Sequence, residues 1–423
     1  MGRRRKRGAW QVAGPRGSTG RDICKGWYVS LEEARVTETL DTVRQLLPTD
    51  AYTTDAWFAR EQRELFGRVW NFAGMREDLS KPGDYLCVQA GVFPLVLIQG
   101  DDGELRAFHN LCRHRGSRLL EGAGNVGPAV RCFYHGWTYA LDGSLQGVPQ
   151  EESQFPGLDK SACGLHPASV GAWRNLLFVH PEPDAEPLTD WLADFPQRFG
   201  PHDPEALVEV SSVRYRFRAN WKIVVENFID GYHFFHLHSV SLGNGDFVRQ
   251  KWLPAGRHWT FKRPMKEGTR VEGRLLPVIP DCGPQFGVDA HVLFPNLGLY
   301  GTATSWLTFH VVPVAPDLSH VDIRTRAMPE ALARLRPERE RPVLTDDVIV
   351  SASGPIASYM SPSPKVHPLE SNDVMAEDIY ACEAVQKGMQ SPRYQVGPMS
   401  RDYERALMWY QQNVLDFVPL NSA

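Results

Sequence analysis

Two short segments of the sequence each bring one cysteine and one histidine together. Cys112 and His114 lie two positions apart, and Cys132 and His135 lie three positions apart. A structural zinc site usually groups its ligands as a cysteine pair and a histidine pair, or as four cysteines. Here the two types alternate in two tight turns. This pattern suits a cluster of two irons, one bound by both thiolates and the other by both imidazoles.

That ligand set predicts the electron chemistry of the site. A 2Fe–2S centre with two Cys and two His ligands is a Rieske centre, and its neutral imidazoles make it less negative than an all-Cys cluster. It therefore accepts an electron more easily, at about −150 to +300 mV against about −400 mV. Gly116 and Gly136, which follow the histidines, allow the tight turns. The alternatives are a zinc site of the same residues and four buried side chains without a metal.

A glycine-rich segment between the two turns matches the pattern G-x-G-x-x-G at residues 122–127. A dinucleotide site with this pattern needs a preceding strand and a following helix. Pro128 follows at once and Cys132 comes soon after, so there is no room for that helix. We therefore predict a turn here.

A second group of polar residues lies in the amphipathic segment 220–238, which we expect to form a helix. Glu226, Asp230 and His233 recur at spacings of four and three, so they share one helical face. Apolar residues flank that face, which favours an interior site. Two histidines with a distant carboxylate are the ligand set of a non-haem Fe(II) oxygenase.

The spacing leaves the second histidine of this site open. Helix geometry favours His233 with His236, which lie three positions apart on one face. His238 lies about 140° around an ideal helix from His233, so it can bind only if the helix ends or loosens near Phe235. The carboxylate must come from another element. The predicted helix at about 372–390 offers four acidic residues, which are Asp373, Glu377, Asp378 and Glu383. Asp378 lies on its inward face with Cys382 and Val385, although a solvated acidic face is the alternative.

Composition restricts the class of protein. The chain has 423 residues, 42% of them hydrophobic, and a net charge of −4. This excludes a wholly disordered chain and argues against nucleic-acid binding. No run of 18 apolar residues is present, so we predict no membrane span. The seven cysteines are too few for a disulfide framework and predict a reducing, cytoplasmic location.

The elements that would position these residues follow from periodicity and turn residues. Apolar spacing predicts a helix within 40–70, capped by Thr53 or Thr54. Short strands and glycine turns follow over 84–177, then strands from about 208 to 328, and helices at 372–390 and 401–417. This order predicts an α+β fold. The basic segment 1–20 is interpreted as a tail, a mis-assigned start or a transit peptide.

The two motifs together resemble the large (α) subunit of the Rieske non-haem iron oxygenases, the ring-hydroxylating oxygenase family. The resemblance covers roughly residues 45–417. It implies a small all-β Rieske domain and a helix-grip catalytic domain with a large antiparallel sheet. We place a tail and lead-in helix at 1–45, the Rieske domain with its preceding helix at 46–180, and the catalytic domain at 181–423.

The resemblance also implies roles for individual residues. Cys112, His114, Cys132 and His135 would bind the 2Fe–2S cluster. The family pattern Asp-x-x-His-x-x-x-x-His selects His233 and His238 for the mononuclear iron, with Asp378, eight residues before Gln386, as third ligand. Asp230 would bridge His233 to a cluster histidine, His135, of the next subunit, which implies a homotrimer.

The resemblance implies a terminal oxygenase that uses O₂ and electrons from a separate NAD(P)H reductase, with or without a ferredoxin. The implied reaction is mono- or dioxygenation of a small organic substrate, foremost an aromatic ring, as in aromatic hydrocarbon catabolism. The alternative substrate is a quaternary ammonium compound such as betaine or choline. A small β subunit is an open point. A Rieske electron carrier and an inactive binding subunit are the rival classes.

Substrate contacts are predicted less sharply. The candidate pocket walls are Phe234, Phe286, Phe294, Leu299, Tyr300, Trp306 and Phe309. Arg324 and Arg326 are candidates for binding a substrate carboxylate, although their alternation along a strand favours a solvent face.

Overall fold

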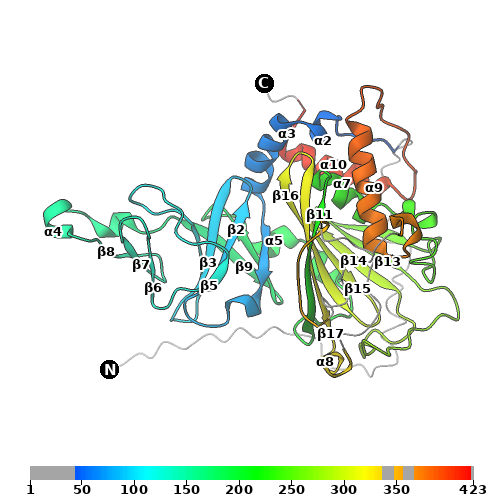
Figure 1. Ribbon diagram of the computed structural model, residues 1–423, viewed down its shortest axis with the longest axis horizontal. Coiled ribbons are helices and arrows are strands. Elements are labelled where there is room, and N and C mark those ends of the chain that lie inside the picture. The colour runs from blue at the N-terminus through cyan, green and yellow to red at the C-terminus, as the bar shows by residue number, and fades with distance from the viewer. Residues whose placement is uncertain (1–42, 336–346, 356–365, 421–423) are drawn as a thin grey trace, which may run out of the picture. The chain divides into compact units, whose positions relative to one another are not determined.

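The computed structural model describes residues 43–335, 347–355 and 366–420, as Figure 1 shows. The predicted tail therefore lies outside the described residues, apart from residues 43–45. The described residues form one unit in their contacts, so the predicted domain boundary between 180 and 181 stays a prediction. No helix within the described ranges has both the length and the apolar character to cross a membrane.

The first half of the chain forms two antiparallel sheets. The larger has the strand order β1-β10-β9-β4-β3-β2-β5 and the smaller the order β6-β7-β8. Their strands are β1 (Asn71–Met75), β2 (Asp84–Ala90), β3 (Phe93–Gln99), β4 (Leu105–His109), β5 (Ala123–Asn125), β6 (Ala129–Arg131), β7 (Thr138–Ala140), β8 (Leu145–Gly147), β9 (Pro167–Trp173) and β10 (Leu176–His180). The glycine-rich segment 122–127 is β5 with its turns, and strand β6 follows where a dinucleotide site needs a helix.

The second half of the chain is built on an eight-stranded antiparallel sheet with the order β12-β13-β14-β15-β16-β17-β11-β18. Its strands are β11 (Val208–Phe217), β12 (Lys251–Ala255), β13 (His258–Arg263), β14 (Val288–Leu293), β15 (Leu297–Gly301), β16 (Trp306–Ala315), β17 (Leu318–Ala327) and β18 (Ile349–Ser353). The predicted α+β class is confirmed. Short helices α4 (Glu151–Gln154), α5 (Leu188–Leu192), α6 (Phe195–Arg198) and α8 (Ala331–Arg334) connect the strands.

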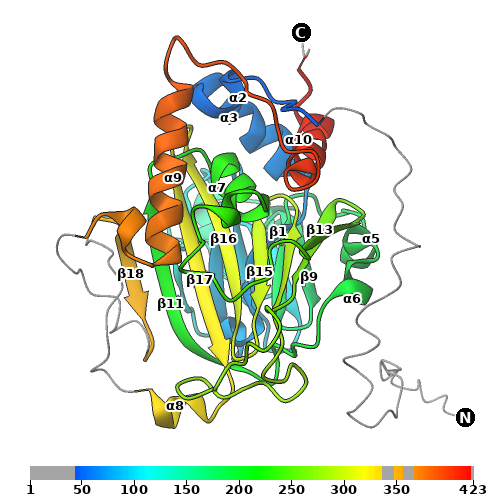
Figure 2. The ribbon, with the colours of Figure 1, turned by 90° about the vertical axis from the view of Figure 1, so that its right-hand side faces the viewer.

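Helices cover one face of the eight-stranded sheet, as Figure 2 shows. Helix α7 (Trp221–Ile229) contacts β16 and β17, and helix α9 (Val374–Met389) contacts β11 and α7. Helix α10 (Arg405–Phe417) packs against α7 in turn. The two late helices were expected at 372–390 and 401–417, so their positions agree closely with the apolar periodicity.

The expected helix within 40–70 is broken into short pieces. They are α2 (Asp50–Thr53), α3 (Asp55–Arg60), a π-turn at Glu61–Leu65 and a 3₁₀ turn at Phe66–Arg68. Thr54 separates the first two because its backbone is extended, and its hydroxyl accepts a hydrogen bond from the Trp57 amide at 3.3 Å as an N-cap. The fully buried Glu61 pairs with Lys222 of α7 at 2.7 Å. Tertiary contacts of this kind override the helical pattern.

The helix predicted over 220–238 is also shorter than expected, because α7 ends at Ile229. The Asp230 carboxylate accepts a hydrogen bond from the Tyr232 amide at 2.6 Å, which turns the chain away from the helix. Gly231 then passes close to Gln250, whose side-chain nitrogen would lie 2.8 Å from a Cβ at this position. A separate 3₁₀ turn follows at His233–Phe235.

Arg324 and Arg326 serve neither as a solvent face nor as free cations. Arg324 forms ion pairs with Asp78 and Glu209 at 2.5 Å, and Arg326 pairs with Glu77. Both arginines therefore tie the 3₁₀ turn at Arg76–Leu79 to strand β17. The idea that they bind a substrate carboxylate was wrong, because acidic residues of the chain already occupy them.

Candidate metal centres

The two Cys-His turns share one backbone geometry. The Cys112 amide donates to the Ser117 carbonyl, and the Gly116 amide donates back to the Cys112 carbonyl. In the second turn, the Cys132 amide donates to the Trp137 carbonyl, and the Gly136 amide donates to the Cys132 carbonyl. Gly116 and Gly136 have φ values of +70° and +73°, which other residues adopt only at a cost. The sequence therefore folds twice into the same tight loop.

The two loops place the histidines next to each other and the cysteines next to each other. The His114 and His135 rings have their centroids 4.6 Å apart. Cys112 and Cys132 are both buried, and the pKa of the Cys112 thiol is raised, first by burial and further by Cys132 beside it. The pKa of His114 is lowered, first by burial and then by His135.

The arrangement does not fit one zinc ion. The ligand atoms of a single tetrahedral zinc, bound at about 2.0–2.3 Å, all lie within about 4 Å of one another. Of the four predicted cluster ligands, no three bring their ligand atoms within 4.8 Å of one another. A two-iron cluster separates a cysteine pair from a histidine pair in just this way. In addition, the buried Nδ1 atom of His114 has no hydrogen-bond partner among the described residues.

Two aromatic residues of the following segment complete the surroundings. The Trp137 ring stacks on His114 with an interplanar angle of 7°. The Tyr139 hydroxyl lies 3.3 Å from the Cys112 sulfur and accepts a hydrogen bond from the Arg113 amide at 2.9 Å. The sequence analysis did not identify Tyr139. Its position on strand β7, directly after the second loop, could have indicated a contact with the cluster ligands.

In the catalytic half, the structure brings His233, His238 and Asp378 together. Their ligand atoms all lie within 4.8 Å of one another. Asp378 Oδ1 lies 2.9 Å from His238 Nε2 and 3.8 Å from His233 Nε2. His236, which ideal helix geometry had favoured, is exposed. The early end of α7 explains the difference, because the chain no longer follows helical spacing between residues 233 and 238.

Neighbouring groups hold His238 in place. Its Nδ1 atom lies 2.7 Å from the buried carboxylate of Glu377, which also accepts a hydrogen bond from the Ser241 hydroxyl. Burial opposes a positive charge on His238, but Asp378 and Glu377 outweigh it and raise the pKa of the imidazole. A proton on Nδ1, donated to Glu377, leaves the Nε2 lone pair free for a metal.

Asp230 lies next to His233, the other histidine of the group. Its Oδ2 atom is 3.1 Å from His233 Nδ1, without the alignment of a hydrogen bond, so this buried nitrogen has no hydrogen-bond partner among the described residues. Asp230 and His233 are both partly exposed, unlike His238. Solvent therefore reaches this part of the group, whereas His238 is enclosed.

Other acids that share these helices have different roles. Glu226 accepts hydrogen bonds from the Tyr52 hydroxyl at 2.7 Å and from Gln411 at 3.0 Å, away from His233. Burial raises the pKa of Glu226 to about 7. Asp373 caps α9, and Glu383 accepts from the Arg218 amide. The expectation that Glu226 shares a polar face with His233 was wrong because α7 ends between them.

The candidate pocket walls separate into two sets. The Phe234 ring lies 4.4 Å from the His233 ring and 5.8 Å from the His238 ring. Tyr300 and Phe309 contact Phe228 of α7. The remaining aromatic candidates lie elsewhere, with Phe294 stacked on Phe417, Trp306 against Phe199 and Phe286 against His202.

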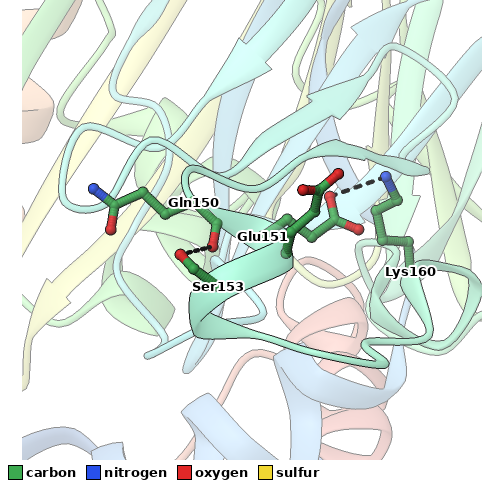
Figure 3. Close-up of a pocket in the computed structure, with 5 residues that line it drawn as sticks. Gln150, Glu151, Ser153 and Lys160 are labelled. Atoms are coloured by element: carbon green, nitrogen blue, oxygen red, sulfur yellow. Dashed lines mark hydrogen bonds and ion pairs between the residues drawn. The ribbon is translucent and has the colours of Figure 1, made fainter.

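An open surface pocket lies in the first half of the chain, as Figure 3 shows. Gln150, Glu151, Ser153 and Lys160 line it, and Lys160 forms an ion pair with Glu151 at 3.1 Å. None of its lining residues belongs to either predicted ligand set.

Comparison with known families assigns both halves of the chain. Residues 69–162 match the Rieske [2Fe-2S] domain, and residues 204–420 match the ring hydroxylating alpha subunit (catalytic domain). Both spans lie inside the domains predicted from the sequence.

Curated relatives include two oxygenases of quaternary ammonium compounds. The glycine betaine monooxygenase oxygenase subunit of Chromohalobacter salexigens is 28% identical over 89% of this chain and 88% of its own length. The chloroplastic choline monooxygenase of Spinacia oleracea is 25% identical over 87% and 78%. The biphenyl 2,3-dioxygenase subunit alpha of Rhodococcus jostii is 33% identical, but over 51% of this chain and 49% of its own.

Solved structures share the fold. The quaternary ammonium Rieske monooxygenase CntA, in complex with an inhibitor, has a TM-score of 0.68 over 96% of this chain and 99% of its own, at 19% identity. Naphthalene 1,2-dioxygenase from Rhodococcus sp. has a TM-score of 0.65 over 88% and 94%, at 20% identity. Since the catalytic-domain match alone spans half of the chain, the protein belongs to the Rieske non-haem iron oxygenases as an alpha subunit, an oxygenase with a Rieske cluster and a mononuclear iron that takes electrons from a partner reductase.

Proposed function

We propose that this oxygenase hydroxylates an N-methyl group of a small quaternary ammonium substrate at an iron bound by His233, His238 and Asp378. The observation that carries the proposal is the convergence of their ligand atoms within 4.8 Å. Two histidines and one carboxylate leave coordination positions open for oxygen and substrate. The two relatives that match along most of their length, glycine betaine and choline monooxygenases, support this substrate class.

The iron, when bound, activates O₂ with electrons that the Rieske cluster supplies. One oxygen atom enters a C–H bond of the N-methyl group, and the other leaves as water after uptake of two electrons and two protons. The resulting N-hydroxymethyl group loses formaldehyde, which leaves the demethylated amine. Glu377 orients His238 through Nδ1, so that Nε2 faces the other two ligands.

For the cluster, we propose that Cys112 and Cys132 bind one iron and that His114 and His135 bind the other. The pairing of buried thiols with each other, and of imidazoles with each other, supports this assignment. His135 is exposed, whereas both cysteines are buried. Electrons would therefore leave through the histidine side.

We further propose that electrons pass between subunits of a homotrimer, from His135 of one chain through Asp230 and His233 of the next. Exposed aromatic side chains beside both ends support such a contact. Phe133 and Tyr134 next to His135 are 80% and 54% exposed, and Tyr232 next to Asp230 is 56% exposed.

We also propose a cytoplasmic location, which the six described cysteines support because none of them forms a disulfide.

An aromatic substrate is the second candidate. Phe234, which lies beside His233, and the Phe228 and Tyr300 rings packed against the same apolar cluster could hold a ring as well as a cationic amine. The biphenyl dioxygenase relative favours it, although over half of the chain.

Metal analysis of anaerobically purified protein tests the proposal. We expect two cluster irons, one mononuclear iron and two acid-labile sulfides per chain, with a Rieske EPR signal after dithionite reduction. Zinc without sulfide would overturn the reading, and a cluster without mononuclear iron, even after added Fe(II), would indicate an electron carrier. With reductase present, formaldehyde release from N-methyl compounds, against diol or phenol formation from arenes, identifies the substrate class. Size measurement and subunit analysis of the purified complex test for the trimer and for a small β subunit.

A further inference from the structure

Arg263, the last residue of β13, is buried beside the proposed iron ligands. Its guanidinium lies 5.1 Å from the ring centroid of Phe234 and 5.3 Å from that of Phe247. The Phe234 ring in turn lies 5.8 Å from the His238 ring. The Phe234 ring therefore lies close both to this cation and to a proposed iron ligand.

The guanidinium forms no ion pair with a carboxylate among the described residues. Nη2 donates to the Tyr300 hydroxyl at 3.2 Å, but Nη1 is buried and has no hydrogen-bond partner in the described part of the chain. Arg263 is 4% exposed and forms no ion pair with a described carboxylate. Arg326, the other buried arginine of the described residues, pairs with Glu77 and with two backbone carbonyls.

A buried charge without a counter-ion is costly, and contacts with aromatic rings offset only part of that cost. A glycine in the neighbouring backbone nevertheless leaves space for the Arg263 side chain. A Cβ at Gly245 would lie 2.7 Å from Arg263 Nε, so the covering segment approaches the guanidinium as closely as glycine allows. The side chain is thus enclosed, with one donor left for a group that the described residues do not supply.

Two other polar atoms on the same face of the sheet are also buried without a hydrogen-bond partner among the described residues. Trp252 pairs with Phe261 across β12 and β13, which puts it on the face that carries Arg263. The Trp252 Nε1 atom is buried and without a hydrogen-bond partner among the described residues, as is Gln250 Oε1 just before β12. Two buried donors, Trp252 Nε1 and Arg263 Nη1, are therefore available on this face beyond Phe234.

We propose that Arg263 binds a carboxylate of the substrate, so that this oxygenase acts on a carboxylate-bearing molecule. The carboxylate would lie at Nη1, while the group to be oxidised points past Phe234 to the iron. This inference rests on the proposed oxygenase function and deepens it. For N-methyl substrates it selects zwitterions over alcohols, and for arenes it selects aromatic acids over neutral rings.

Substrate binding to the iron-loaded enzyme tests the proposal without turnover. Nitric oxide added to the Fe(II) site gives an EPR signal that changes when a molecule binds beside the iron. The probes are glycine betaine against choline, and benzoate against benzamide. We expect a carboxylate probe to bind about 10- to 100-fold more tightly than its matched partner, as a charge-assisted hydrogen bond predicts. Equal binding within both pairs, or no response to either carboxylate, would overturn the proposal.

Variants locate the effect on Arg263. R263M should remove the preference for the carboxylate, whereas R263K should keep part of it, because an ammonium retains the charge but not the planar fork. R257M, at the opposite end of the same hairpin, should bind like the wild type. An R263M protein that still prefers the carboxylate as the wild type does would contradict the assignment. If R263M fails to fold, the comparison of probes on the wild type still decides whether a carboxylate subsite exists.

Failure of the oxygenase proposal would be seen separately. A chain without mononuclear iron gives no nitrosyl signal at all, before any probe is added. A chain with the signal but no preference for carboxylates retains the oxygenase function and loses only the role of Arg263.

Discussion

The two proposed metal sites are built in opposite ways. The cluster ligands come from two loops that close within five residues, each by the same pair of backbone hydrogen bonds. The iron ligands come from a 3₁₀ turn, the loop after it and helix α9, with 140 positions between His238 and Asp378. The first site depends on local turns, and the second depends on how α7 and α9 pack against the same sheet. A change in a ligand should therefore remain local in the first case and involve packing in the second.

Removing one iron ligand should separate the sites most completely. We expect His238→Ala to lose the mononuclear iron and all product formation, while the Rieske EPR signal stays. His236→Ala is the matched control, because His236 is exposed and should leave both metals in place. Iron and sulfide analysis of both variants checks this. Loss of iron from the His236 variant instead would restore the ligand pair that helix geometry favoured.

The connection between the sites is tested by Asp230→Asn. Both metals should remain, but product formation should fall by about 100-fold or more, because electrons no longer pass efficiently between subunits. Single-turnover measurement of cluster oxidation, with iron content as the control, separates slow transfer from a lost site. Unchanged turnover would exclude Asp230 as the bridge.

The packing dependence of the iron site is tested by Glu377→Gln. The variant should weaken iron binding about 10- to 100-fold, since a carboxylate that orients a ligating histidine contributes on this scale. Glu383→Gln, further along the same helix, is the control and should bind iron like the wild type. Titration of metal-free protein with Fe(II) measures both. Equal affinity in all three proteins would mean that Glu377 does not position His238.

The smallest effect is expected at the cluster. A hydrogen bond from Tyr139 to the Cys112 sulfur stabilises the more negative, reduced form, so Tyr139→Phe should lower the reduction potential. A bond worth about 1 kcal/mol corresponds to about 40 mV for one electron. A redox titration followed by EPR measures the shift, and the mononuclear iron content should not change. A raised or unaltered potential would show that Tyr139 does not donate to the sulfur.

The contrast between the sites also shows how far residue spacing can predict each of them. Residue spacing alone placed cysteine with histidine in each turn and indicated the two-iron pattern, because a loop of five residues leaves few other geometries. Periodicity also located the late helices to within a few residues. In contrast, the helix expected through residue 238 ends at Ile229, where Asp230 bonds to the Tyr232 amide. That local competition cannot be read from apolar spacing.

The sequence by itself thus determined the chemistry available to this protein, namely the ligand types, the two tight loops and the acidic late helix. Tertiary structure decided which residues meet. It brought His238 rather than His236 to His233 and Asp378, assigned Glu377 to His238, and moved Glu226 into the core with Tyr52. It also paired Arg324 with acids of the chain while leaving Arg263 Nη1 without a partner among the described residues. The physical reason is that hydrogen bonds within one turn are fixed by neighbouring residues, whereas burial and charge pairing depend on segments that only the folded sheet brings together.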